Sequence, residues 1–221
     1  MDVEPFLAAE AHRESTREAL GYEDHHVVIG KVARLFHLKG HEYVIQAARS
    51  VIDRHPNARF LFVGDGILRE NLQRQIESRG LTDYFQFTGL VPPGRIPELI
   101  SAMDIVVHSS LREGLARVLP KAMISGVPVV SYDVDGAREV VLPGETGFLL
   151  PAKAIDEMAE ALDELISDPQ LRRALGQEGR RRWTEVFRHE HMTDEIRKLY
   201  EKLLKERGFK PEQLTSLPTT P

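Results

Sequence analysis

This sequence predicts an α/β fold of the doubly wound type, built on a parallel sheet of about six strands. Short apolar runs alternate with amphipathic helical segments at intervals of roughly 20 to 30 residues. Such alternation indicates parallel strands joined by right-handed crossovers, with helices on both faces. Polar loops follow the apolar runs, at the carboxyl ends of the strands, where sheets of this type bind ligands. No internal repeat divides the chain, so one domain and a tail are expected.

The composition is typical of a water-soluble globular protein. The chain has 221 residues, 42% hydrophobic and 29% charged, and its net charge of −5 argues against a nucleic-acid-binding protein. Because cysteine is absent, disulfides, thiolate zinc sites and a thiol nucleophile are excluded. No apolar stretch approaches the roughly 20 residues that span a bilayer, and the first residues do not resemble a signal peptide. We therefore expect a cytoplasmic protein without a transmembrane segment.

The chain begins with a polar, mixed segment and then enters the first strand–helix unit. A short helix is expected at residues 13–20, ended by Gly21, and a buried strand at 27–33. Residues 41–54 carry apolar side chains at helical spacing, and Pro56 ends that helix.

The middle of the chain repeats the alternation. A Gly-Asp-Gly turn at residues 64–66 separates the second strand from the second helix, in which leucine or isoleucine recurs every fourth residue. The expected strands are residues 59–63, 84–88 and 105–108, the helices are 68–80 and 96–103, and a proline–glycine loop lies at 90–94.

The last third is expected to be mostly helical. A strand at 129–130 and a short strand at 146–150 precede it, and residues 155–205 predict three helical pieces, broken near Pro169 and near Phe187. Trp183 is expected to be a packed anchor rather than a base-stacking residue. Two apolar stripes are expected to face the core: Leu162, Leu165 and Ile166, and Ile196, Leu199, Tyr200 and Leu203. A partner-binding groove is the less favoured alternative.

The most informative segment, residues 113–130, places an acid and a glycine at the mouth of an expected helix. Glu113-Gly114 opens this helix and Ser-Gly-Val-Pro closes it into a strand. Unpaired N–H groups at a helix amino terminus suit a phosphate. The carboxylate of Glu113 would repel phosphate, so it is expected to face a neutral, hydroxyl-rich part of the ligand. A site that holds phosphate and sugar together is a nucleotide-sugar site.

Two cations flank the loop after the first strand. Arg34 and Lys39 precede the helix at 41–54, where they are placed to bracket a diphosphate. Two solvated surface cations are the alternative. Because the other polar loops converge on the same edge of the sheet, the binding interpretation is favoured.

The remaining motifs are weak. Gly64-Asp65-Gly66 is interpreted as a tight turn that needs positive φ, with room left for a ligand. It lacks the G-x-G-x-x-G fingerprint, which disfavours a nicotinamide-dependent oxidoreductase. Asp133 and Asp135 are interpreted as a solvated loop rather than a metal site, and the histidines form no ligand pattern. No metal is expected.

Five motifs follow one another in a fixed order. They are Lys31-Val32-Ala33-Arg34-Leu35 with Lys39-Gly40, then Gly64-Asp65-Gly66, then Phe87-Thr88-Gly89-Leu90-Val91-Pro92, then residues 102–114 ending in Glu-Gly, and residues 122–130. In this order, from residue 1 to about 205, the sequence resembles the C-terminal domain of the retaining, GT-B type glycosyltransferases of group 1. The resemblance implies a Rossmann-like sheet, the C-terminal half of a GT-B fold.

The resemblance also implies roles for individual residues. Arg34 and Lys39 would hold the donor diphosphate, the backbone around Gly114 and Leu115 would assist them, and no metal or other cofactor would be needed. Glu113 would bind the hydroxyls of the donor sugar. The catalytic residues implied are Arg34, Lys39 and Glu113, and the donor-binding residues are Arg34, Lys39, Gly66, Leu90, Val91 (pairing with the base through its backbone), Glu113, Gly114, Leu115, Arg117 and Lys121.

Two positions depart from the family pattern. Lys121 stands where the family has a second glutamate for the ribose hydroxyls. An ammonium only donates hydrogen bonds whereas a carboxylate accepts them, so donor binding is expected to be weaker by about 1.5–3 kcal/mol. Asp135 replaces the first of two glycines, which predicts a less open loop.

The resemblance implies a domain organisation and a function. Residues 1–26 resemble an interdomain linker with a first helix, 27–205 a nucleotide-sugar-binding domain, and 206–221 a disordered tail. The chain is expected to be the donor-binding half of a hexosyltransferase that uses a UDP- or GDP-type sugar with retention of configuration. Without the N-terminal acceptor domain, which would also make any peripheral membrane contact, it is expected to be inactive. The alternative is a non-catalytic nucleotide- or partner-binding module.

Overall fold

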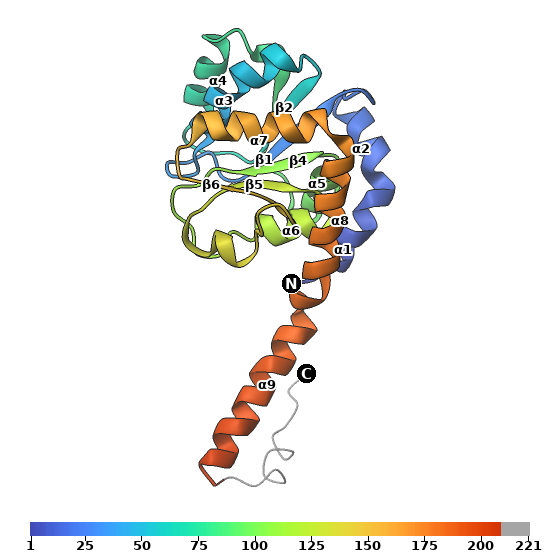
Figure 1. Ribbon diagram of the computed structural model, residues 1–221, viewed down its shortest axis with the longest axis vertical. Helices are drawn as coiled ribbons and strands as arrows, with labels where there is room; N and C mark the ends of the chain where they lie inside the picture. The colour runs from blue at the N-terminus through green and yellow to red at the C-terminus, as the bar shows by residue number, and fades with distance from the viewer. Residues whose placement is uncertain (209–221) are drawn as a thin grey trace.

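A computed structural model describes residues 1–208, which fold around one parallel sheet. The strand order is β3-β2-β1-β4-β5-β6 (Figure 1). The first three strands therefore run from β1 toward one edge of the sheet, and β4 to β6 run from the other side of β1 toward the opposite edge. This confirms the predicted doubly wound, Rossmann-like sheet. The strands are β1 (Val27–Val32), β2 (Ala58–Val63), β3 (Phe85–Gly89), β4 (Ile105–His108), β5 (Val129–Tyr132) and β6 (Gly147–Leu150).

Helices cover both faces of the sheet. The elements α3, α4 and α7 pack on one face, and α1, α5 and α6 on the other, with α8 crossing beside α6 (Figure 1). The helices are α1 (Glu4–Ala8), α2 (Arg13–Ala19), α3 (His41–Arg54), α4 (Arg69–Glu77), α5 (Ile96–Ser101), α6 (Val118–Ile124), α7 (Ile155–Ser167), α8 (Pro169–Val186) and α9 (His189–Glu206).

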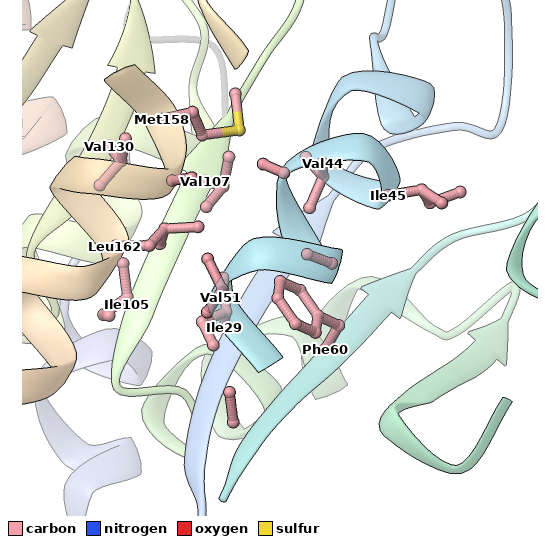
Figure 2. Packing of buried hydrophobic residues seen from close by; sticks show 14 of the residues in the cluster. Ile29, Val44, Ile45, Val51, Phe60, Ile105, Val107, Val130, Met158 and Leu162 are labelled. Atoms are coloured by element: carbon pink, nitrogen blue, oxygen red, sulfur yellow. The ribbon is translucent and has the colours of Figure 1, made fainter. Parts of the chain in front are cut away.

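Apolar side chains from the strands form the core. Figure 2 shows Val51 of α3 and Leu162 of α7 lying over strand residues such as Ile29. Because the central strands are covered on both faces, their side chains are apolar nearly throughout, as expected for a parallel sheet. The stripe Leu162, Leu165 and Ile166 faces this core, as predicted.

The amino-terminal segment is more ordered than its composition suggested. The helix α1 and the 3-10 turn Ala9–His12 precede α2, although no helix was expected before residue 13. Val3 and Phe6 are buried against α5 and α6, which explains why these turns are held. Arg13 and Arg17 of α2 both donate to the carboxylate of Asp104, at 2.6 and 3.0 Å.

The prediction for the last apolar stripe was wrong. The helix α9 has no buried residue and extends away from the body of the protein (Figure 1). The residues of its stripe are each 44–62% exposed: Ile196, Leu199, Tyr200 and Leu203. Trp183 on α8 is packed as predicted, edge-on to Phe187. The expected disordered tail falls almost entirely on residues 209–221, outside those described.

Within residues 1–208, no helix combines the length and the apolar character needed to cross a bilayer.

Candidate functional site

A lysine–glutamate ion pair joins two loops at the carboxyl edge of the sheet. Lys39, in the loop after β1, donates from Nζ to Glu113 Oε1, in the loop after β4. β1 and β4 are neighbours in the sheet, so their loops meet although 74 residues separate the two side chains. The side chains remain 20% and 28% exposed, so a ligand can reach both. The structure therefore brings together two of the three residues predicted as catalytic.

The two loops are locked to each other by their backbones. Leu111 N donates to Leu38 O at 2.8 Å. Gly40 directly precedes α3 with φ of +68°, and a Cβ atom there would lie 2.0 Å from the carbonyl oxygen of Ser109. Leu38 also has a positive φ, +66°, which is strained for a residue with a side chain. The position of Lys39 is thus set by backbone contacts as well as by its ion pair.

Arg34 lies at the start of the same loop. Its side chain is exposed, and its guanidinium carbon is 5.7 Å from the centre of the Phe36 ring. Among the described residues it has no ion-pair partner. An exposed guanidinium is suited to bind an anion with more than one oxygen.

The carboxylate of Glu113 is ionised across the physiological range. Its pKa is lowered to about 2, by His108 beside it and by the Lys39 ammonium. His108 Nε2 lies 3.9 Å from Glu113 Oε1, and burial lowers the pKa of that imidazole, which is therefore neutral near pH 7. Glu113 N donates to the Asp135 carboxylate, which holds the loop. An ionised Glu113 can only accept hydrogen bonds, so it suits a ligand with sugar hydroxyls that donate them.

Three buried titratable side chains beneath the ion pair were missed by the sequence analysis. Lys31, His41 and His108 are at most 3% exposed. Both ring nitrogens of His41, and Nε2 of His108, find no hydrogen-bond partner within residues 1–208. Lys31 sits in the apolar run of β1, a strand buried on both faces. Its place inside that apolar run was the available signal for burial.

The Gly-Asp-Gly turn packs against the loop after β1. Gly64 and Gly66 have φ of +137° and +156°, and Cβ atoms there would lie 2.2 and 2.4 Å from the carbonyl oxygens of Ala33 and Leu35. The predicted turn with positive φ is confirmed. The glycines are required by the close approach of a neighbouring loop.

The loop after β3 lies two strands away from Arg34. Leu90 is 86% exposed and Val91 is partly buried, and a backbone bridge between Gly64 and Gly89 ties this loop to the Gly-Asp-Gly turn. Leu90 and Val91 thus lie on the same edge of the sheet as the ion pair, displaced by about 10 Å at ordinary strand spacing.

The helix expected to open at Glu113-Gly114 begins later. α6 starts at Val118, so Gly114 and Leu115 lie in the preceding loop and the exposed Arg117 directly precedes the helix without a side-chain capping hydrogen bond. Pro120 explains the boundary, because proline is tolerated only in the first turn of a helix. Gly114 O accepts from Gly136 N at 3.1 Å, which joins this loop to the one after β5.

Lys121 lies apart from the ion pair. Its Nζ is 5.5 Å from the centre of the Phe6 ring on α1, and partial burial, with Arg117 nearby, lowers its pKa. Lys39, Glu113 and Arg34 are therefore gathered on two adjoining loops, whereas Lys121 faces the amino-terminal helix.

The acidic loop after β5 is used internally. Arg138 Nε donates to Asp133 at 2.9 Å, and Asp135 accepts from the backbone of Glu113. Across residues 1–208, no group of three or more His, Asp or Glu side chains is arranged to hold a metal ion.

Comparison with known proteins identifies the family. The sequence profile described as glycosyl transferases group 1 matches residues 12–182. The chain belongs to the group 1 glycosyltransferases. The alpha-D-kanosaminyltransferase of Streptomyces kanamyceticus is 36% identical over 168 residues, which cover 76% of this chain and 43% of the relative. The D-inositol 3-phosphate glycosyltransferase of Corynebacterium urealyticum is 32% identical, over 80% of this chain and 43% of its own length.

Solved structures of other proteins have the same fold. HepE of Anabaena, in a complex with UDP, has a TM-score of 0.83 at 26% identity, covering 91% of this chain and 56% of HepE. The C-terminal domain of the group 1 protein LpcC from Francisella tularensis has a TM-score of 0.70 at 26% identity, covering 76% of this chain and 89% of that domain. The chain thus resembles the C-terminal domain of a group 1 glycosyltransferase and spans less than half the length of the two relatives named above.

Proposed function

We propose that this chain binds the nucleoside-diphosphate sugar from which a group 1 glycosyltransferase transfers a hexose, with retention of anomeric configuration. The observation that carries the proposal is the Lys39–Glu113 ion pair, with Arg34 at the start of the Lys39 loop. Two cations and an ionised carboxylate at one sheet edge match a ligand that has a diphosphate next to hydroxyl groups.

Each side chain has a task in this proposal. Arg34 and Lys39 neutralise the charge that develops on the departing nucleoside diphosphate, which fixed cations do without a metal. Glu113 accepts hydrogen bonds from the sugar hydroxyls and gives up part of its contact with Lys39 when the diphosphate arrives. The UDP bound in the HepE structure supports a nucleotide as the ligand.

Transfer requires more than this site. The relatives have a further half that the 221 residues do not match. We propose that this further half supplies the acceptor site, and that the chain alone binds nucleotide but transfers little sugar. Turnover by the pure chain at rates typical of whole enzymes would contradict this part of the proposal.

Thermal unfolding in the presence of UDP, GDP and ADP, each added separately, tests the binding. A nucleotide present at a hundred times its Kd contributes about 2.7 kcal/mol and should raise Tm by roughly 5–10 °C. Lys39→Met should abolish the shift, whereas Lys202→Met, which removes an exposed lysine of α9, should leave it intact. A shift with one nucleotide also identifies the base.

Lys121 supports the second candidate, a module that binds a partner and has lost its donor site. Its ammonium lies over Phe6 rather than beside Glu113. Lys121→Glu distinguishes the two functions. If no nucleotide shifts Tm in either the wild type or this variant, the partner-binding module is the better description.

A further inference from the structure

A buried lysine lies directly below the candidate site and is connected to it. Lys31 at the end of β1 is 1% exposed, and its Nζ donates to Ser109 Oγ at 3.0 Å. That hydroxyl donates in turn to Gly40 O at 2.7 Å. Gly40 follows Lys39, so the chain of hydrogen bonds leads from Lys31 to the loop that presents the site cation.

The surroundings of Lys31 suit a neutral amine better than an ammonium ion. An ammonium has three N–H donors, and Ser109 Oγ is the one acceptor found for them within residues 1–208. Burial first, and then the charge of Lys39, lower the pKa of Lys31 to about 7, while Glu42 and Glu113 act in the opposite direction.

The other titratable groups of this cluster do not compete for a proton near neutral pH. Burial is the largest cause that lowers the pKa of His41, to about 2, and of His108. The carboxylate of Glu113 is ionised. Lys31 is therefore the group of the cluster that is partly protonated near pH 7, so a nearby charge changes its protonation most.

We propose that Lys31 is a positioning residue of the donor site, which takes up a proton from solvent when a diphosphate binds and so adds a positive charge beneath it. This inference rests on the function proposed above. The amine gains one proton and becomes an ammonium, and no other bond is made or broken. Because Lys31 is enclosed, it acts through charge and through Ser109 and Gly40, without touching the ligand.

The expected size of the proton uptake follows from Coulomb's law. One negative charge about 8 Å away, at an effective dielectric constant of about 20, raises the pKa of Lys31 by about 1.5. At pH 8 the free amine is about one-tenth protonated and the diphosphate is already fully ionised. One or two phosphate charges then lead to uptake of about 0.7 to 0.9 protons per ligand.

Isothermal titration calorimetry with UDP at pH 8 measures this uptake. The titration is run in Tris and in HEPES, whose ionisation enthalpies differ, and the difference in observed heat gives the protons taken up. Wild type should take up about 0.7 to 0.9 protons, as should the matched control Lys202→Met. Lys31→Met should bind UDP with proton uptake near zero. Its affinity for UDP should not fall between pH 7.5 and 8.5, whereas the affinity of wild type should fall severalfold over the same range.

The outcomes separate this inference from the proposed function. UDP binding to wild type with no proton uptake overturns the inference and leaves the donor site standing. Equal uptake by wild type and Lys31→Met also overturns it, because another group then titrates. If UDP, GDP and ADP all fail to bind wild type, both proposals fall. A wild-type titration that shows UDP binding without proton uptake overturns the inference even if the variant does not fold.

Discussion

Replacing the buried Lys31 by methionine should stabilise the chain by an amount that depends on pH. Burial, reinforced by Lys39, lowers the pKa of the amine from 10.5 to about 7 in the folded protein. In the unfolded chain the amine is hydrated and keeps its ordinary pKa. The unfolded state therefore binds the proton more tightly, and folding is penalised wherever the unfolded amine is charged.

The magnitude follows from the two pKa values. Their difference, 10.5 − 7, is 3.5, and at about 1.36 kcal/mol for each unit the penalty is about 5 kcal/mol. The penalty is complete below about pH 7, where both states are protonated, and it is absent above about pH 10.5, where both are neutral. Between these limits the advantage of Lys31→Met over wild type should fall by about 1.4 kcal/mol per pH unit.

Equilibrium urea denaturation of both proteins from pH 6 to pH 9 measures this advantage. Titrating groups that do not interact with Lys31 cancel in the difference. The lost hydrogen bond to Ser109 contributes an offset that does not vary with pH. A difference in the free energy of unfolding that stays constant from pH 6 to 9 would refute the assignment of a depressed pKa to Lys31.

Two further substitutions test contacts that hold the site and the amino-terminal helices. Gly40→Ala should destabilise the protein by about 1–3 kcal/mol more than Gly80→Ala. Gly80 has a similar positive φ, but no atom lies within 4 Å of the added Cβ. Equal losses of stability would show that the backbone at Ser109 moves away from the new methyl group at little cost. Asp104→Asn should cost about 3–5 kcal/mol, because Arg17 is left buried without its carboxylate. Asp53→Asn, on an exposed pair, should have little effect, and a similar loss there would contradict the argument.

The fold was predictable because each strand is an apolar run bounded by glycine, proline or polar residues. The expected positions of β1 to β6 agree with the structure to within a few residues. The helix α1 was missed because Pro5 and the acidic residues around it are typical of a linker, and only Phe6 hints at burial. The stripe on α9 was misassigned because a helical periodicity shows that one side is apolar, not what covers it.

The candidate site was predictable to the level of its loops. The rule that ligands bind at the carboxyl ends of parallel strands brought Arg34, Lys39 and Glu113 to one edge. The ion pair itself depends on β1 and β4 being neighbours, which the order of strands along the chain does not give. A lysine inside an apolar run gives no sign of its protonation, so the chemistry of Lys31 emerged only with its packing.

The exposed helix α9 determines how unfolding of this chain is best followed. With no residue buried, α9 can unwind while the sheet stays intact, and far-ultraviolet circular dichroism would record both events as one loss of ellipticity. The sole tryptophan, Trp183, lies on α8 and packs beside Phe187 against the body. Its fluorescence therefore reports the globular part alone, and a gap between the two signals measures how independently α9 melts.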